Sequence, residues 1–303
     1  MKEMEGISYL FGYPLKHSLS PLVHNTTFEN LGIPFKMTAL ESLDMPAFLQ
    51  LTQEPRFFGA AVTMPHKVSI MPHLDEIDSE GRDVGACNTI YVTAVGGRRR
   101  LWGTNTDCVG IREAFAQNMP ETLYRGRPGL VVGGGGASRA AVYALKKWMG
   151  CSTIYLVNRD RQEVDDLIAH FEQRGLAEGL LFVEELGQAD TLEGPGAIVS
   201  CVPNFPPKTE AEGKARGVLE AFLSKQHKGA LLEMCYHPTP WTEIANIAQK
   251  AGWHVLLGTE ALIYQGLEQD RYWTSRPLED LPVEKVKEAV TAALEEFARS
   301  QGL

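Results

Sequence analysis

Two polar clusters follow apolar, strand-like stretches at separate places in the sequence. Lys67 ends the stretch AAVTMPHK at residues 60–67, and Asp107 lies within GTNTDCVG at residues 103–110. Because open α/β sheets bind ligands at the carboxyl ends of their strands, these two side chains could meet in one cleft. A lysine beside a carboxylate is a candidate for proton transfer, since burial and neighbouring charges shift its pKa. The alternative is a surface ion pair, which contributes little.

A glycine-rich turn between an apolar strand and a helix indicates a dinucleotide site. GLVVGGGGASRAAVYALKKWMG occupies residues 129–150, and the strand-like STIYLVN follows it. Gly133, Gly135 and Gly136 would let the backbone approach a pyrophosphate, while the helix N-terminus presents free N–H groups and a positive dipole. The alternative is a glycine turn without a ligand. The order strand, turn, helix, strand favours the dinucleotide.

The end of the next strand bears on the choice between NAD and NADP. A carboxylate there can bond the ribose 2′-hydroxyl, whereas a basic group pairs with a 2′-phosphate. The segment VNRDRQEV contains both kinds, with Arg159 and Arg161 beside Asp160 and Glu163. A solvated helix start, with Asp160 facing the helix dipole, is the alternative. These residues alone leave the choice open.

The segment KHSLSP adds two hydroxyl groups on the loop after the first expected strand. Ser18 and Ser20 are one residue apart, so in an extended segment they would face opposite ways. For Ser20 the alternative to ligand binding is helix capping, because its oxygen can accept from free N–H groups while Pro21 takes the first helical position.

The pattern of apolar residues predicts the elements that position these groups. Short β-rich runs alternate with longer helical stretches, which is typical of an α/β protein with a largely parallel sheet. Strands are expected at ISYLFG, FKMTAL, GAAVTM, NTIYVTAV, GLVV, STIYLVN, GAIVSCVP, GALLEMCY and WHVLLG. Helices are expected at 21–31, near 46–51, after His66, from about Val109, after the glycine turn, from Glu260 and from Pro282. The basic GGRRR is expected to be a hairpin turn with a solvated tip.

Length, charge and cysteine usage narrow the class of protein. A chain of 303 residues fits two domains, and a formal net charge of -9 disfavours nucleic acid and anionic membranes as partners. The five cysteines show neither C-x-x-C nor zinc-ligand spacing, so no metal site is expected. No apolar run is long enough for a signal-peptide core or a membrane span, and we therefore expect a cytoplasmic protein.

Together these stretches resemble the shikimate/quinate dehydrogenase family. The resemblance is carried, in this order, by KHSLSP, VTMPHK, GACNT, NTD, GGGGASR and GTEALIYQG. GTEALIYQGLEQDRYW, VTMPHK and SCVPNFPP are most similar to the fungal quinate-utilising branch. The resemblance implies an α/β substrate-binding and catalytic domain, residues 1–113 completed by 263–303, and a Rossmann-type doubly wound parallel-sheet domain, 114–262. It also implies hydride transfer between a ring carbon of a hydroxylated cyclohexane or cyclohexene carboxylate and nicotinamide C4. We expect oxidation of quinate to 3-dehydroquinate and of shikimate to 3-dehydroshikimate, by a monomer or homodimer.

The resemblance also implies the roles of individual residues. Lys67 would be the proton shuttle and Asp107 would orient the reacting hydroxyl. Ser18 and Ser20 would hold the substrate carboxylate, with Tyr236 near it, and Thr63, Asn88 and Gln265 would bond ring hydroxyls. Our own candidates for the extra hydroxyl of quinate are Thr106 and Tyr236. The dinucleotide would contact Gly133, Gly135, Gly136, Ala137, Ser138, Asn158, Arg159, Asp160, Val202 and Gly258.

Several positions depart from the family pattern. Ala61 stands where Asn is common, SCVP at 200–203 stands for Asn-Ala-Thr-Pro, and Glu260-Ala261 replaces Gly-Met. In the NADP-using branch the strand end reads Asn-Arg-Thr with another base three residues after that Thr. Here Asp160 and Glu163 stand at those two positions, which favours NAD. The alternatives are an NADP-dependent biosynthetic shikimate dehydrogenase, a non-catalytic sensor of quinate-pathway metabolites, and an unrelated NAD-linked reductase that shares only the Rossmann unit.

Overall fold

The computed structural model describes residues 6–236 and 239–300, and contacts divide the chain into two compact units. The first unit comprises Met1–Thr106 and Leu262–Leu303, and the second comprises Asp107–Ala261. This division assigns all of helix α5 (Asp107–Asn118) to the second unit. Among the described residues, no helix combines the length and the apolar character that crossing a membrane requires.

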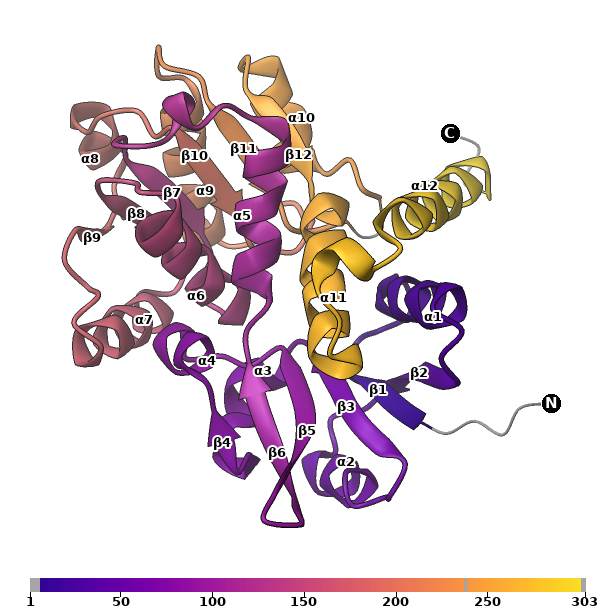
Figure 1. The fold of residues 1–303 in the computed structure, drawn as a ribbon. Helices are drawn as coiled ribbons and strands as arrows, with labels where there is room; N and C mark the ends of the chain where they lie inside the picture. The colour runs from indigo at the N-terminus through magenta and orange to yellow at the C-terminus, as the bar shows by residue number, and fades with distance from the viewer. Residues whose placement is uncertain (1–5, 237–238, 301–303) are drawn as a thin grey trace. The chain divides into compact units, whose positions relative to one another are not determined.

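The first unit is built on a mixed six-stranded sheet, drawn in indigo to magenta in Figure 1. Strand β1 is parallel to β2 and β3, whereas β5 runs antiparallel to β3 and β6. The strands, in the order in which they lie in the sheet, are β2 (Phe35–Glu41), β1 (Gly6–Gly12), β3 (Phe57–Val62), β5 (Thr89–Val95), β6 (Arg98–Thr104) and β4 (Glu76–Ile77). The helices are α1 (Ser20–Asn30), α2 (Met45–Leu51), α3 (His66–Ser69), α4 (Ser79–Val84), α12 (Val283–Ser300) and most of α11 (Gly258–Thr274).

The sheet of the first unit has apolar side chains on both faces. Alternate residues of a strand point to opposite faces, so Leu10 and Phe11 of β1 enter different cores. Leu10 packs in a cluster with Phe28 of α1 and Trp273 of α11, whereas Phe11 stacks on Phe48 of α2. Two buried faces explain why these strands are nearly continuous apolar runs in the sequence.

The expected hairpin turn at GGRRR is confirmed. Gly96 and Gly97 join β5 to β6 with φ values of 58° and 75°, which is the left-handed geometry of a type I′ turn. Of the arginines that follow, Arg99 donates to the backbone carbonyls of Glu54 and Phe57. The tip is exposed, and the Arg99 guanidinium anchors the hairpin to Glu54 and to Phe57, the first residue of β3.

The second unit is a six-stranded parallel sheet with helices on both faces. Its strands lie in the order β12 (His254–Leu257), β11 (Ala230–Glu233), β10 (Ala197–Ser200), β7 (Gly129–Val132), β8 (Ile154–Val157) and β9 (Leu180–Phe182). Its helices are α5, α6 (Gly136–Tyr143, continued by a π-helical turn at Ala144–Trp148), α7 (Arg161–Gln173), α8 (Leu186–Thr191), α9 (Glu210–Leu223) and α10 (Glu243–Lys250). Numbered within the unit, the strand order is 6-5-4-1-2-3, the doubly wound Rossmann order, which confirms the predicted fold class.

Three local predictions differ from the structure. Strands β4 and β9 were not expected, because they are edge strands of two and three residues without a fully buried residue. Helix α5 begins at Asp107 and not near Val109. Helix α1 has Leu19 as its N-cap residue and no side-chain cap, so the interpretation of Ser20 as a helix cap is wrong.

Gly59 in β3 leaves the space in which Trp273 of α11 reaches the sheet. The indole Nε1 donates to the carbonyl oxygen of Ile90 at 2.9 Å, and a Cβ on Gly59 would lie 2.3 Å from that Nε1. We expect Gly59→Ala to lower the free energy of unfolding by about 2 kcal/mol, because the added methyl group overpacks this contact. Urea unfolding measures the effect.

Gly213→Ala is the matched control, since a Cβ at this position in α9 meets nothing within 4 Å. Alanine is the better helix former, so this variant should be neutral or more stable by about 0.5–1 kcal/mol. Equal stability of Gly59→Ala and wild type would contradict the packing argument.

Candidate active site

Asn88 lies at the centre of a buried hydrogen-bond network in the first unit. Its Nδ2 donates to Thr106 Oγ1 at 3.0 Å and to Gln265 Oε1 at 3.1 Å. Its Oδ1 accepts from the Thr106 N–H at 2.8 Å and from Thr89 Oγ1 at 2.7 Å. Three of the predicted substrate contacts, which are far apart in the sequence, are thus brought together in one place.

Gln269 adds a second layer to this network. Its Nε2 donates to the backbone oxygen of Asn88 at 3.0 Å and to Thr89 Oγ1 at 2.9 Å. Gln265 and Gln269 lie one helical turn apart, so both reach the start of β5 from the same face of α11. Sequence reasoning missed Gln269, although the i, i+4 spacing of two glutamines in an expected helix is a signal that could have found it.

Ser18, just before α1, and Ser20, its first residue, contact each other, and Ser20 also contacts β2. Ser18 Oγ accepts from the backbone N–H of Ser20 at 3.3 Å, so Ser18 and not Ser20 satisfies a free donor at the helix start. Ser20 is buried, and its hydroxyl lies 3.9 Å from the Met37 sulfur in β2. The hydroxyl of Ser20 therefore points towards the sheet.

Lys67 and Asp107 each follow a strand, as expected. Lys67 lies in the short helix α3, and its carbonyl oxygen accepts from the Cys87 N–H at 2.7 Å, next to Asn88. Asp107 is buried and opens α5 directly after Thr106, which Asn88 holds. Thr63, between β3 and α3, donates its N–H to Phe11 at 2.9 Å. The pairing of Lys67 with Asp107 stays a prediction.

The glycine turn of the second unit leaves open space in front of a helix N-terminus. Gly135 is the N-cap residue of α6, without a side-chain cap, and a Cβ on it would meet nothing within 4 Å. Gly133 has a φ of 118°, and a Cβ there would lie 2.9 Å from Ser138 Oγ and 3.4 Å from Val202 Cγ1. The Ser138 hydroxyl is buried without a hydrogen-bond partner among the described residues. This turn fits a pyrophosphate, whose oxygens would accept from the free N–H groups. Gly136 and Ala137 are the first two residues of α6.

After β8 the side chains form a local hydrogen-bonded cap. Asp160 is the N-cap residue of α7, and its Oδ1 accepts from the Gln162 N–H at 2.9 Å. Asn158 Nδ2 donates to Glu163 Oε2 at 2.7 Å. The helix-start interpretation of Asp160 is therefore confirmed, and the carboxylate remains at the strand end where a ribose would lie.

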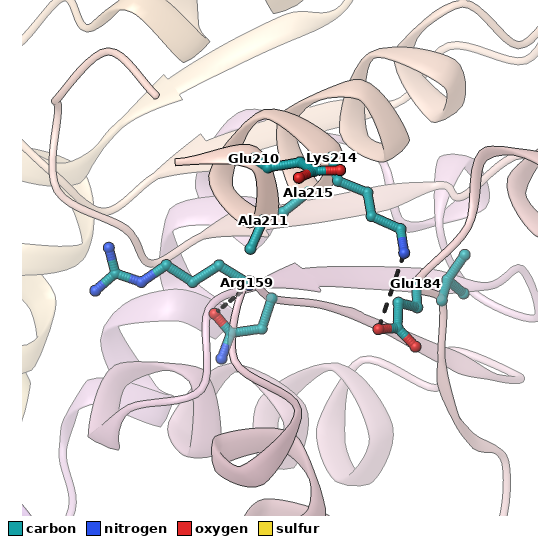
Figure 2. A pocket seen from close by; sticks show the side chains of 8 residues that line it. Arg159, Glu184, Glu210, Ala211, Lys214 and Ala215 are labelled. Carbon is teal, nitrogen blue, oxygen red and sulfur yellow. Dashed lines mark hydrogen bonds and ion pairs between the residues drawn. The ribbon is translucent and has the colours of Figure 1, made fainter. Parts of the chain in front are cut away.

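A pocket of about 330 Å³ adjoins this strand end (Figure 2). It is lined by Asn158, Arg159, Val183, Glu184, Glu210, Ala211, Lys214 and Ala215. Both of its basic residues are paired: Arg159 forms an ion pair with Glu212 of α9, and Lys214 with Glu185. Hydrogen bonds from the N–H groups of Lys208 and Thr209 and from Arg159 lower the pKa of Glu212 to about 2. Glu212 is therefore a carboxylate at all physiological pH values.

Comparisons with known proteins agree on one family. Residues 10–90 match the family model "Shikimate dehydrogenase substrate binding domain". The chain is 46% identical over an alignment of 319 residues to quinate dehydrogenase from Emericella nidulans, covering 98% of this chain and 97% of the relative. The chain belongs to the shikimate/quinate dehydrogenase family. It is an oxidoreductase acting on CH–OH groups.

Solved structures of the family share the fold. Shikimate 5-dehydrogenase from Thermus thermophilus, in complex with NADP(H) and shikimate, superposes with a TM-score of 0.74 at 30% identity, covering 95% of this chain and 100% of that one. Quinate dehydrogenase from Corynebacterium glutamicum, in complex with NAD, gives a TM-score of 0.77 at 21% identity, covering 95% and 99%. At that identity the second likeness shows the fold alone.

The last two predicted site residues follow β11 and β12. Gly258 begins α11, and a Cβ there would lie 2.5 Å from the Met234 carbonyl oxygen, so the close approach of two backbone segments requires glycine. Tyr236 comes three residues after the end of β11. Its neighbours in the EMCYHP motif, His237 and Pro238, lie outside the described residues. The roles of Tyr236 and Gly258 stay predictions.

Glu233 is a buried carboxyl group that sequence reasoning did not identify. It ends β11, is 1% exposed, and pairs in register with Ser200 of β10, one of the departures from the family pattern. It accepts from Thr242 Oγ1 at 2.9 Å and from the Cys235 N–H at 3.1 Å. Burial nevertheless raises its pKa from 4.5 to about 7. A signal was present in the sequence, because Glu233 is the only charged residue in the apolar run GALLEMCY.

The raised pKa of Glu233 predicts a pH dependence of stability. Between about 4.5 and about 7 the folded state holds a proton that the unfolded state has lost, so stability falls as pH rises through this window. The loss is at most about 3 kcal/mol. Glu233→Gln cannot ionise and should lose less stability than wild type when urea unfolding is compared at about pH 5 and about pH 8. Parallel pH profiles of the two proteins would refute the assignment.

Proposed function

We propose that this protein is a NAD-dependent dehydrogenase that oxidises quinate to 3-dehydroquinate and shikimate to 3-dehydroshikimate. The first unit would bind the alicyclic acid and the second the dinucleotide. The observation that carries the proposal is the buried network around Asn88, which ends at Thr106, directly before Asp107. A polyhydroxylated ring needs several neutral donors and acceptors beside a single acid/base group. The Emericella nidulans relative, named quinate dehydrogenase, supports quinate as a substrate.

In the proposed reaction each group of the chain has a separate task. Ser18 and Ser20 would bind the substrate carboxylate. The ring hydroxyls would be bonded by Thr63, Asn88 and Gln265, and the extra hydroxyl of quinate by Thr106 and Tyr236. Lys67 receives the proton of the reacting hydroxyl, while Asp107 orients that hydroxyl. Gly133, Gly135 and Gly136 would hold the dinucleotide, which when bound supplies a hydride acceptor at the nicotinamide ring.

Lys67→Ala tests the acid/base assignment. Loss of such a group lowers kcat by about 10²–10⁴-fold, and substrate binding should be largely kept because neutral groups provide it. Initial rates of NADH formation with quinate and with shikimate measure the effect. The control is Lys36→Ala, an exposed lysine in β2, which should leave kcat unchanged. Turnover of Lys67→Ala near the wild-type rate would remove Lys67 from the mechanism.

The charges around the pocket support NAD over NADP. Among its described lining residues the basic ones, Arg159 and Lys214, already have carboxylate partners. A 2′-phosphate would bring about two negative charges close to Asp160, Glu163 and Glu184. A ribose 2′-hydroxyl carries no charge and can donate to the Asp160 carboxylate. Both dinucleotides occur in the solved relatives, NADP(H) in the Thermus thermophilus enzyme and NAD in the Corynebacterium glutamicum enzyme.

Glu212→Gln tests whether the partner of Arg159 sets this preference. Glu212 accepts from the Thr209 N–H at 3.0 Å in a capping box, and glutamine preserves such a box while removing the charge. Arg159 would be free to pair with a 2′-phosphate, which should raise kcat/KM for NADP⁺ relative to NAD⁺ by about tenfold, the worth of one charge-assisted hydrogen bond.

The matched control is Glu220→Gln, which removes an exposed carboxylate from the same helix without contacting Arg159. Its coenzyme ratio should equal that of wild type. A wild-type preference for NADP⁺ would overturn the proposal of NAD, and an unchanged ratio in Glu212→Gln would exclude Glu212 from coenzyme selection.

A further inference from the structure

A histidine and an aspartate form a fully buried pair between two helices of the first unit. His24 Nδ1 of α1 lies 2.7 Å from Asp270 Oδ1 of α11, and both side chains are 0% exposed. The imidazole ring packs edge-on against Trp273, with ring centroids 4.8 Å apart. Because neither side chain reaches solvent, no substrate can touch the pair, and it is not an acid/base dyad.

The pair links the two helices that carry proposed substrate contacts. His24 lies one turn after Ser20 in α1, so both side chains share one face of that helix. Asp270 lies next to Gln269, about 100° further around α11, so neighbouring faces of α11 reach β5 and α1. The pair therefore spans from the helix proposed to bind the carboxylate to the helix proposed to bind the ring hydroxyls.

Close packing at Gly266 supports a defined register between these helices. A Cβ on Gly266 would lie 2.8 Å from Val23 Cγ1 and 3.5 Å from His24 Cε1. The contact with Val23 and the His24–Asp270 pair are one turn apart on α11, and together they fix both the rotation and the axial position of the helix. A shift of α11 by a fraction of a turn would move Gln265 away from Asn88 and Thr106.

A gain in folding stability does not by itself explain a buried histidine–aspartate pair. Burial raises the pKa of Asp270, and His24 opposes that rise, so the carboxylate is desolvated at a cost that its partner offsets. Apolar residues of similar volume are often as stabilising as a buried pair, whereas a directional hydrogen bond defines one register. The arrangement therefore suits positioning better than stabilisation.

We propose that His24 and Asp270 are positioning residues that set the distance between the carboxylate-binding and hydroxyl-binding groups of the substrate site. This inference rests on the proposed function and deepens it. It predicts that loss of the pair weakens binding of the alicyclic acid and leaves binding of the dinucleotide unchanged.

The test compares three variants by steady-state kinetics and thermal unfolding. Asp270→Ala should raise KM for quinate and for shikimate by about 10- to 100-fold, the usual result of misplaced binding groups, with KM for NAD⁺ within about twofold. Asp270→Asn keeps a hydrogen-bonding partner for either tautomer of His24 and should restore KM. The double variant H24F/D270L fills the space with apolar groups and should recover Tm while KM for the acid stays high.

The matched control is Thr52→Val, which removes another buried hydrogen bond of the first unit, from Thr52 Oγ1 to Leu49 at 2.8 Å. It should lower Tm without changing either KM. Recovery of both Tm and KM in H24F/D270L, or a KM that rises equally in Thr52→Val, would overturn the positioning role. A wild-type protein inactive towards both acids would instead overturn the proposed function, and the inference with it.

Discussion

The side-chain amide of Asn88 is the interaction on which the first unit depends most. Its four hydrogen bonds join the start of β5, the end of β6 and helix α11. Most of α11 belongs to the first unit, although in the sequence it follows the second unit. A buried amide with missing partners is costly, so each of these four hydrogen bonds favours the native arrangement of the groups around it. Asn88 therefore holds Thr106 and Gln265 close to each other. Thr106 is also the last residue of the first unit before Asp107, so the network positions the start of α5.

The two units offer different physical environments to the ligands proposed for them. Around Asn88 the groups are neutral and buried, which suits the directional recognition of hydroxyls. In the second unit the features are an uncapped helix end at Gly135 and a rim of ion pairs that includes Arg159–Glu212 and Lys214–Glu185. There an excess of carboxylates would disfavour an additional phosphate by charge. Family membership gives the reaction class, and the neutral groups around Asn88 suit the several hydroxyl groups of an alicyclic acid.

Local patterns in the sequence sufficed for most elements of the fold. Apolar runs predicted most strands of both sheets but not the short edge strands β4 and β9, and the glycine turn predicted the start of α6, because these signals lie within a few residues of one another. Long-range pairs could not be predicted in this way. His24 and Asp270 are 246 positions apart and Arg159 and Glu212 are 53 apart, and no periodicity links such residues. The interpretation of Ser20 as a helix cap was wrong for a similar reason. The Ser20 N–H donates to the hydroxyl of Ser18, and the Ser20 hydroxyl donates to the sulfur of Met37 in β2.

Transfer of a deuterium label tests the central claim most directly. Quinate carrying deuterium on the carbinol carbon at C3 would be incubated with the purified protein and NAD⁺, and both products analysed by NMR and mass spectrometry. The account predicts 3-dehydroquinate without the label and reduced NAD with deuterium at nicotinamide C4. Recovery of all the label in unreacted quinate, with NAD⁺ and with NADP⁺ alike, would contradict it.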